Sequence, residues 1–346
     1  MTDTLRVGII GAGNMGGRHA RHWSRLPGAR VAAVADVQAE KAERLAAHVA
    51  EASGGAAPRV FADGAALIAD GGVDAVSICL PTPLHRPPAE AAFAAGKHVL
   101  CEKPMALTLA DCDAMIEAAG RSGVVFTVGQ VVRFFPEYAR AKALVDGGAV
   151  GTPAAVRVRR VGDFRRMDTD WYADPEQGGG VLFDLLVHDF DWLLWCFGPV
   201  TRVYAKGRIE QMMARSIDHL DYALVTLRHA SGVTSHAEGT WTDPGGFATS
   251  FEIAGDGGLL EHDSRKGVTL RRALRQSGEP GARGIAVPES PLAPEDDPYY
   301  RQTEAFVQAI RTGAPTVVRP EEARAAVAVA VAARESVRTG EAVPLG

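Results

Sequence analysis

The sequence contains few cysteines, and none of them is paired at the spacing of a metal or redox site. Among 346 residues there are 4 Cys and no CxxC pair. Each cysteine lies in an apolar stretch, where a thiol behaves as a small core residue. These are Cys79, Cys101, Cys112 and Cys196. We therefore expect buried free thiols, which suits a reducing compartment.

A net positive charge, a long apolar run and a leader segment are also lacking. The 37 Lys and Arg against 42 Asp and Glu give a net charge of -5, so no overall positive field attracts nucleic acid or an anionic membrane. No apolar run approaches the roughly 20 residues that span a bilayer. The N-terminal string MTDTLRVGIIG has no basic segment followed by an apolar run and a cleavage site. We therefore expect a cytoplasmic protein without a signal peptide.

The composition that is present is typical of a globular chain. Hydrophobic residues make up 47% and charged residues 23%, which excludes disordered and fibrous proteins. The length is about twice that of one domain of roughly 150 residues. This length suggests two domains and also allows one large α/β unit. The sequence shows no internal repeat.

The first third of the chain alternates short apolar runs with helical patterns, as in parallel strands joined by crossover helices. Helices are expected from the glycine-rich turn to about residue 26 and over 38–50. The expected strands are residues 5–10, 30–35, 73–80, 97–101 and 124–129. This pattern predicts an α/β fold with a doubly wound parallel sheet.

From about residue 153, apolar and polar residues exchange at nearly every position, which predicts an antiparallel or mixed sheet with one covered face. Helical patterns interrupt or follow this sheet at about residues 180–196, 299–311 and 321–338. Residues 276–298 are rich in Gly, Pro, Ser and acids and predict a surface loop. We expect a cofactor domain over residues 1–130 and a substrate domain over residues 131–346.

Residues 11–16, GAGNMG, form a GxGxxG motif between an apolar strand and a helix. Small residues there let the backbone approach a pyrophosphate, whose charge the helix N-terminus stabilises. Asp36 ends the second strand about 20 residues later, where its carboxylate can bind ribose hydroxyls and would repel a 2′-phosphate. This pattern predicts NAD rather than NADP. The residues assigned to the cofactor are Gly11, Gly13, Asn14, Met15, Gly16, Asp36, Leu80, Thr82, His85, Glu102 and Lys103.

Lys103 lies in the string CEKP, directly after an expected strand. Pro104 ends the strand, so Lys103 would project from the carboxyl edge of the sheet, where open α/β sheets bind ligands. An ammonium group there can hydrogen-bond a substrate hydroxyl and take part in proton transfer. A surface lysine paired with Glu102 is the structural alternative.

A second polar group follows the triple glycine Gly178 to Gly180. Asp184, His188 and Asp191 have the spacing i, i+4 and i+7, which places them on one face of a helix. Three explanations compete for this stripe in an apolar helix: an acid and base pair, a metal site, or a satisfied structural network. The usual ligand set of a metal site is lacking, so we expect no metal.

The GAGNMG loop, the Glu102-Lys103-Pro104 motif and the GGG, Asp184, His188 and Asp191 segment together resemble the glucose-fructose oxidoreductase, inositol dehydrogenase and rhizopine catabolism (Gfo/Idh/MocA) family. The resemblance runs from end to end. It implies a Rossmann domain followed by an α+β domain with a large, mostly antiparallel open sheet. The outer face of that sheet would form the contacts of a homodimer or homotetramer.

Within this family, the string DLLVHDFD is most similar to inositol dehydrogenases. The resemblance implies that Lys103, Asp184 and His188 are catalytic, with Asp184 and His188 also touching substrate. It also points to Arg133 as a donor to substrate hydroxyls, with a surface arginine as the alternative. The loop from Asp168 to Tyr172, which includes Trp171, lies where family members shape the substrate pocket.

We therefore expect an enzyme that oxidises a secondary alcohol of a cyclitol or sugar, as an inositol 2-dehydrogenase does, with hydride passing to NAD. His188 would be the general base, Lys103 would stabilise charge on the reacting oxygen and Asp184 would orient the substrate. The exchanged roles, with Lys103 as the base, stay open. Three alternatives stay open. They are an NAD-dependent glycosidase with no net redox change, an NADP-linked sugar reductase, and a non-catalytic dinucleotide sensor.

Overall fold

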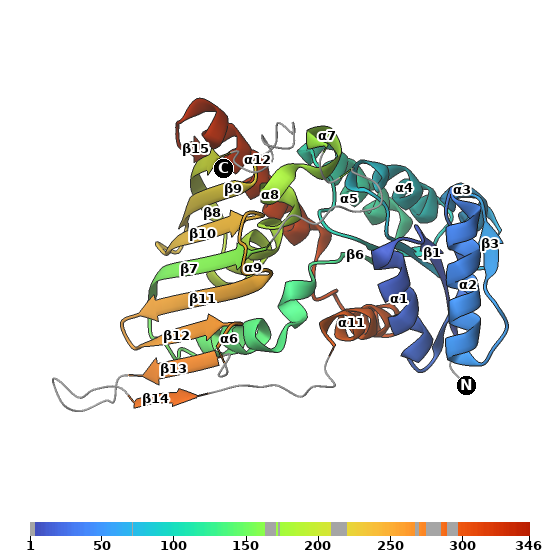
Figure 1. The fold of residues 1–346 in the computed structure, drawn as a ribbon, viewed down its shortest axis with the longest axis horizontal. Coiled ribbons are helices and arrows are strands. Elements are labelled where there is room, and N and C mark those ends of the chain that lie inside the picture. The colour runs from blue at the N-terminus through green and yellow to red at the C-terminus, as the bar shows by residue number, and fades with distance from the viewer. Residues whose placement is uncertain are drawn as a thin grey trace. The chain divides into compact units, whose positions relative to one another are not determined.

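A computed structural model describes residues 4–70, 72–162, 171, 174–208, 220–266, 270–274, 285–288 and 297–346 (Figure 1). The chain divides into two compact units. The first unit holds Met1–Val131 and Asp296–Arg324, and the second holds Val132–Glu295 and Ala325–Gly346.

The first unit contains a six-stranded parallel sheet in the order β3-β2-β1-β4-β5-β6. Its strands are β1 (Leu5–Ile10), β2 (Ala29–Ala35), β3 (Arg59–Phe61), β4 (Ala75–Ile78), β5 (His98–Cys101) and β6 (Phe126–Val128). The strand order reverses direction beside β1, which is the topological switch point where doubly wound sheets bind ligands. This confirms the expected parallel sheet.

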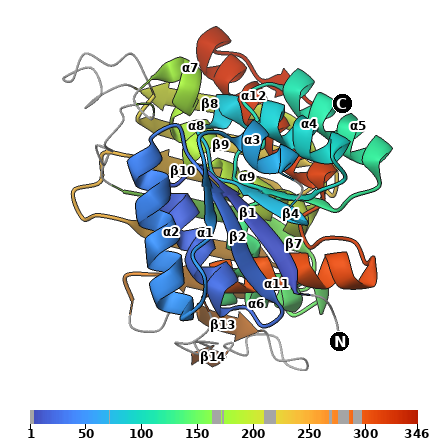
Figure 2. The same ribbon diagram turned by 90° about the vertical axis from the view of Figure 1, so that its right-hand side faces the viewer.

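Helices cover both faces of this sheet. Figure 2 shows α1 and α2 together on one face and α3, α4 and α5 on the other. Their bounds are α1 (Asn14–Arg25), α2 (Ala39–Ser53), α3 (Gly64–Ala69), α4 (Arg86–Ala94) and α5 (Leu109–Ser122), with a 3₁₀ turn, η1, at Thr82–Leu84. Because the sheet is covered on both sides, all four residues of β4 are buried, as the continuous apolar run in the sequence predicted.

The segment 296–324 differs from the expected division of the chain, since it belongs to the first unit. Helix α11 (Pro298–Thr312) packs on α1 there. The ring of Phe306 stands edge-on to Trp23, with 6.2 Å between ring centroids, and Arg311 donates a hydrogen bond to the Gly28 carbonyl. The buried aromatic and aliphatic residues of α11 complete the core around Trp23, which explains why this helix belongs to the first unit.

The second unit contains a nine-stranded sheet in the order β14-β13-β12-β11-β7-β10-β9-β8-β15. Every neighbouring pair is antiparallel except β7 and β10, so the expected mostly antiparallel sheet is confirmed. The strands are β7 (Pro153–Val161), β8 (Val200–Arg208), β9 (Tyr222–His229), β10 (Thr234–Thr240), β11 (Ala248–Gly255), β12 (Gly258–Asp263), β13 (Leu270–Leu274), β14 (Ile285–Pro288) and β15 (Val343–Pro344).

One face of this sheet is covered by helices, as Figure 1 shows for α6, α8 and α9. Apart from α11, the described helices and turns that follow β6 in the chain are η2 (Val131–Phe134), α6 (Pro136–Asp146), α7 (Pro175–Gly178), α8 (Gly180–Asp184), α9 (Val187–Phe197) and α12 (Pro320–Thr339). Under the helices, the ring of Tyr138 lies 5.1 Å from Trp192 and 5.2 Å from Phe251, centroid to centroid. Alternate residues of the central strands are buried on this side, as the alternating sequence pattern predicted.

The expected surface loop over residues 276–298 is wrong in part, because β14 lies inside it. Leu274 of β13 pairs with Ile285 of β14, and Arg271 pairs with Pro288. The string IAVP has the apolar and β-branched residues of a short strand, and its proline is tolerated at the edge of a sheet. Glycine and proline on both sides concealed this strand in the sequence.

Within the described ranges, no helix is both long and apolar enough to cross a membrane.

Candidate active site

The glycine-rich loop between β1 and α1 has the geometry that an approaching pyrophosphate needs. Gly11 has φ +98°, and a Cβ atom there would lie 2.5 Å from the Cys79 carbonyl oxygen. A Cβ atom at Gly16 would lie 1.9 Å from the Gly11 carbonyl oxygen, so these two glycines close the turn. Gly13 is exposed, and a Cβ atom there would meet nothing within 4 Å. The loop is therefore closely packed against the protein at Gly11 and Gly16. Its outer side at Gly13 is open, at the N-terminus of α1.

Asp36 is held against the same loop. One carboxylate oxygen accepts a hydrogen bond from the Ala12 main chain at 2.8 Å, and the other accepts one from the Gln38 main chain at 2.8 Å. Val37 beside it is 87% exposed, and neither Val37 nor Gln38 carries a cation that would bind a 2′-phosphate. The carboxylate is thus fixed beside the loop that a dinucleotide would contact, and the residues fit NAD.

The Glu102-Lys103-Pro104 turn follows β5 at the carboxyl edge of the sheet. The Lys103–Pro104 peptide bond is cis. Glu102 is 6% exposed and Lys103 is partly buried. The Lys103 main chain donates to the Oε2 atom of Glu102 at 3.1 Å. The structure therefore places Lys103 at the edge that the sequence predicted.

The three other residues assigned to the cofactor follow β4. Thr82 and His85 are buried, and Leu80 is partly buried. The Nε2 atom of His85 lies 2.8 Å from the Leu80 carbonyl oxygen, and its Nδ1 atom lies 3.1 Å from that of Pro104. Burial lowers the pKa of His85, against the raising effect of these carbonyls. His85 thus ties the turn after β4 to the turn after β5, and its contact with the cofactor stays a prediction.

Sequence reasoning missed His19, which reaches Glu102 from α1. Its Nε2 atom lies 2.9 Å from the Oε1 atom of Glu102, and both side chains are buried. The signal was weak, because a histidine on an amphipathic helix is common. Its place on the helix that starts at the glycine loop is the only sequence feature that singles it out.

In the second unit, the expected single helix from about residue 180 to 196 is interrupted. Helix α8 ends at Asp184 and α9 begins at Val187. The Leu186 main chain donates to the Val181 carbonyl, five residues back, at 2.9 Å. This is the hydrogen bond of a π-type turn, which inserts extra backbone into a helix and recurs at functional sites. The interruption was not visible from the spacing of the polar residues.

Two of the three stripe residues, Asp184 and His188, are partly buried and lie on either side of that turn. The triple glycine before them has φ +67° at Gly179 and φ +74° at Gly180, conformations that residues with side chains rarely adopt. The glycines therefore set the entry into α8.

The third stripe residue, Asp191, belongs to a buried ion pair. Its two oxygens accept from the Nε and Nη2 atoms of Arg133 at 2.7 and 2.6 Å, and the side chains are 0% and 1% exposed. The surface-arginine alternative for Arg133 is therefore wrong, because two of its donors bind Asp191 in the interior, and its contact with substrate stays a prediction. For Asp191 the structural explanation holds.

A second buried ion pair links α9 to β7. Arg160 donates to Asp189 through Nε at 2.7 Å and Nη2 at 3.0 Å, and Asp189 is fully buried. The sequence carried a signal for this pair. Arg160 lies on the same inward face of β7 as the buried Val156 and Val158. A charged residue at such a position needs a buried partner.

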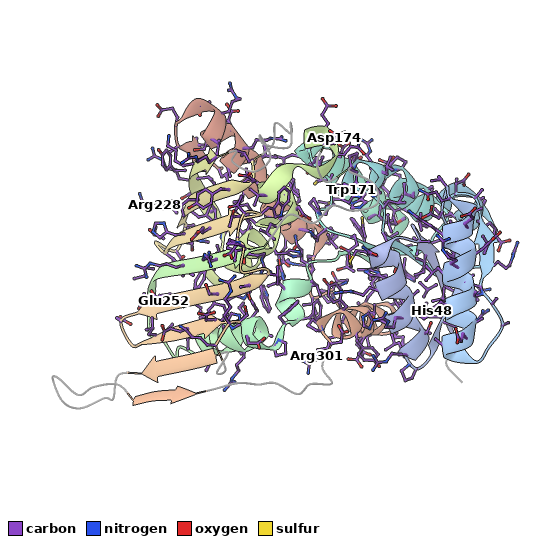
Figure 3. The ribbon with its side chains drawn as sticks, viewed as in Figure 1. His48, Trp171, Asp174, Arg228, Glu252 and Arg301 are labelled. Atoms are coloured by element: carbon purple, nitrogen blue, oxygen red, sulfur yellow. The ribbon has the colours of Figure 1, made fainter. Side chains whose placement is uncertain are left out.

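The structure describes part of the loop that is expected to shape the substrate pocket. Trp171 is partly buried, and its carbonyl accepts a hydrogen bond from the Asp174 main chain at 3.2 Å, at the start of α7 (Figure 3). Asp168 and Tyr172 lie outside the described residues.

Comparison with known proteins agrees with these two units. Residues 5–130 match the oxidoreductase family with NAD-binding Rossmann fold (GFO_IDH_MocA), and residues 138–261 match the GFO/IDH/MocA C-terminal domain. Inositol 2-dehydrogenase 1 of Saccharopolyspora erythraea is 30% identical over 345 residues, which cover 98% of this chain and 96% of the relative. Myo-inositol 2-dehydrogenase of Thermotoga maritima is 28% identical over 344 residues, with coverage of 99% and 98%.

A solved structure is similar along the whole chain. GenD2 from gentamicin A biosynthesis, crystallised with NAD, has a TM-score of 0.85 and 28% identity, and the match covers 100% of this chain and 97% of that one. Both domains match their family models in order, and a relative at 30% identity is covered over 96% of its length. The chain therefore belongs to the GFO/IDH/MocA family of oxidoreductases, and its first unit is the NAD-binding Rossmann fold of that family.

Proposed function

We propose that this protein is an NAD-dependent dehydrogenase that oxidises a secondary alcohol of a cyclitol or sugar, as inositol 2-dehydrogenases do. The observation that carries this proposal is the similarity to proteins named inositol 2-dehydrogenase, which extends over nearly the full length of both chains. The Glu102-Lys103-Pro104 turn and the pair Asp184 and His188 supply the groups that such chemistry requires.

NAD, when bound, supplies the hydride acceptor. Gly11, Gly13 and Gly16 would hold its pyrophosphate at the N-terminus of α1, and Asp36 would hold its adenosine ribose. The carboxylate of Asp36 explains a preference for NAD, because a 2′-phosphate beside it would meet a like charge.

The remaining steps belong to side chains of this chain. His188 accepts the hydroxyl proton of the substrate, because imidazole exchanges protons near neutral pH. The Lys103 ammonium hydrogen-bonds the reacting oxygen and stabilises the charge that develops there. Asp184 orients a second hydroxyl of the substrate. A polyhydroxylated ring carries no charge, so the net charge of -5 does not oppose its binding.

The proposal is tested with a panel of inositols, hexoses, pentoses and aldonolactones, incubated with NAD and followed by NADH absorbance. We expect NADH to accumulate with at least one cyclitol or sugar. Tight NAD binding without NADH across the panel would contradict the proposal. Release of an aglycone from a glycoside without net NADH would indicate a glycosidase instead.

We further propose that the protein is a cytoplasmic homodimer or homotetramer that forms through the face of the nine-stranded sheet opposite α6 and α9. Tyr204 on β8 and Leu224 on β9 are 38% and 42% exposed, and these strands are neighbours in the sheet. Apolar side chains on an open sheet face favour burial against a second copy. Light scattering on wild type and on a Leu224→Glu variant tests this, with a smaller mass expected for the variant.

A further inference from the structure

His19 of α1 takes no part in the steps proposed above, yet it is buried beside the catalytic turn. We propose that His19 is a positioning residue that fixes the Glu102 carboxylate and, through it, the main chain of Lys103. This inference rests on the proposed role of Lys103 in the dehydrogenase reaction.

The contacts form a short chain from α1 to Lys103. The Nε2 atom of His19 lies 2.9 Å from the Oε1 atom of Glu102. The other oxygen of the same carboxylate, Oε2, accepts the Lys103 main-chain hydrogen bond at 3.1 Å. Each oxygen of Glu102 therefore has its own donor, and the orientation of the carboxylate is set from both sides.

The surroundings leave this carboxylate little freedom. The side chains of His19 and Glu102 are 1% and 8% exposed. A Cβ atom at Gly129 would lie 3.0 Å from the Oε1 atom of Glu102, so the glycine after β6 makes room for the carboxylate. The Glu102 main chain donates to the Ile78 carbonyl of β4 at 2.9 Å. A buried carboxylate is costly without a donor, and His19 supplies that donor.

The charges around the pair favour an imidazolium facing a carboxylate. Burial lowers the pKa of His19, but Cys79 and Glu102 outweigh this effect and raise that pKa to about 10. Burial raises the pKa of Glu102, but the hydrogen bond and charge of His19, with the charge of Lys103, lower it overall. The other titratable groups facing the pair are Cys101, His22 and His85. Burial raises the pKa of the Cys79 thiol overall, against the lowering effect of the charge and hydrogen bond of His19.

This arrangement gives Glu102 a cationic partner other than the neighbouring lysine. The Lys103 main chain is then anchored through an ionised carboxylate. Loss of His19 would leave a buried carboxylate with one donor fewer, which raises its pKa and loosens the turn. The Glu102-Lys103-Pro104 turn would then be displaced, and small displacements of reacting groups lower the reaction rate strongly.

The decisive variants are His19→Leu and His19→Gln, because leucine removes the donor and the charge whereas glutamine removes only the charge. His48→Gln on the exposed side of α2 is the matched control (Figure 3). We expect kcat/KM of His19→Leu to fall by roughly 10- to 100-fold, with an intermediate loss in His19→Gln and no change in His48→Gln. We also expect His19→Leu to gain an acidic limb in its pH profile, which the additional Glu102→Gln substitution removes.

Two readouts are independent of the substrate, so that failure of this inference is distinguished from failure of the proposed function. In labelled wild-type protein, the His19 ring should give the NMR signature of an imidazolium at pH about 8, assigned by its loss in His19→Gln. The NAD affinity of the His19 variants, measured by calorimetry, shows whether the fold still binds cofactor. A neutral His19 ring at that pH, or His19→Leu with wild-type kcat/KM and an unchanged pH profile, would overturn the proposal.

Discussion

The aspartates of the 184–191 segment differ in burial and in partners although they lie within two turns of each other. Asp189 and Asp191 are fully buried and bound to arginines, whereas Asp184 and His188 are partly buried. A buried ion pair fixes the place of a helix, while a partly buried acid and imidazole can meet a substrate. This contrast separates the structural residues from the candidate catalytic ones.

Replacing the proton acceptor tests this assignment at the residue level. We expect His188→Ala and Lys103→Ala to lower kcat by on the order of 10² or more, because positioned acid and base groups contribute about that much. Steady-state rates at saturating NAD give the answer, with His48→Ala as the control. If both variants stay within a few-fold of wild type, the assigned roles are wrong.

The expected preference for NAD over NADP is tested at Asp36 and the neighbouring Val37. Asp36→Ser removes the carboxylate that would repel a 2′-phosphate, and a second change, Val37→Arg, adds a cation at a position that is 87% exposed. We expect the double variant to bind NADP at least about tenfold more tightly than wild type and NAD more weakly, since it gains a phosphate partner and loses a ribose contact. Equal affinities of wild type for NAD and NADP would refute the role of Asp36.

At the level of elements, the π-type turn between α8 and α9 and the two arginine pairs together define where His188 lies. Arg160 connects α9 to β7, and Arg133 connects α9 to the segment before α6. The guanidinium of Arg160 also lies 5.8 Å from the centre of the Tyr138 ring. Helix α9 is therefore held by specific polar contacts inside an otherwise aromatic core.

Replacing one residue of such an ion pair should destabilise the protein more than replacing both residues. We expect Asp189→Leu to destabilise the protein by about 3–5 kcal/mol, because it leaves Arg160 charged and buried, and the double variant Arg160→Met/Asp189→Leu to cost much less. Urea unfolding of both variants and wild type measures the difference. A double variant that is at least as unstable as Asp189→Leu would contradict this, because it would show that the unpaired charge of Arg160 is not the cause of the instability.

Sequence patterns predicted most elements because apolar periodicity controls them. The buried run of β4 and the alternating residues of β9 were visible, and so was the glycine loop that opens α1. The edge strand β14 was concealed by the glycines and prolines around it, and the break after Asp184 left no mark in the spacing. The contact of His19 with Glu102 depends on tertiary packing that a single sequence does not reveal. The inward position of Arg160 indicates a buried partner but does not identify Asp189 as that partner.

For the molecule as a whole, the buried pair His19 and Glu102 should make stability depend on pH. The pKa of His19 is raised from 6.5 to about 10, so its contribution is fully present below about pH 6.5 and is lost as the pH rises towards 10. The pKa of Glu102 is lowered, so its contribution is present above its ordinary value of 4.5 and is lost as the pH falls below that.

Urea unfolding of wild type and His19→Gln across this range measures the effect. We expect the stability difference between them to be largest at about pH 6 and to shrink steadily towards pH 10. A difference that is independent of pH would mean that His19 is not an imidazolium in the folded protein.

In the proposed reaction, the carbon that bears the reacting hydroxyl transfers its hydride to NAD, and the substrate is oxidised. The most direct test uses the best substrate of the panel, deuterated at the carbon that bears the reacting hydroxyl, with mass spectrometry of the cofactor. We expect singly deuterated NADH in an amount equal to the ketone formed. Product without labelled reduced cofactor, or label returned to the sugar with no net NADH, would contradict it.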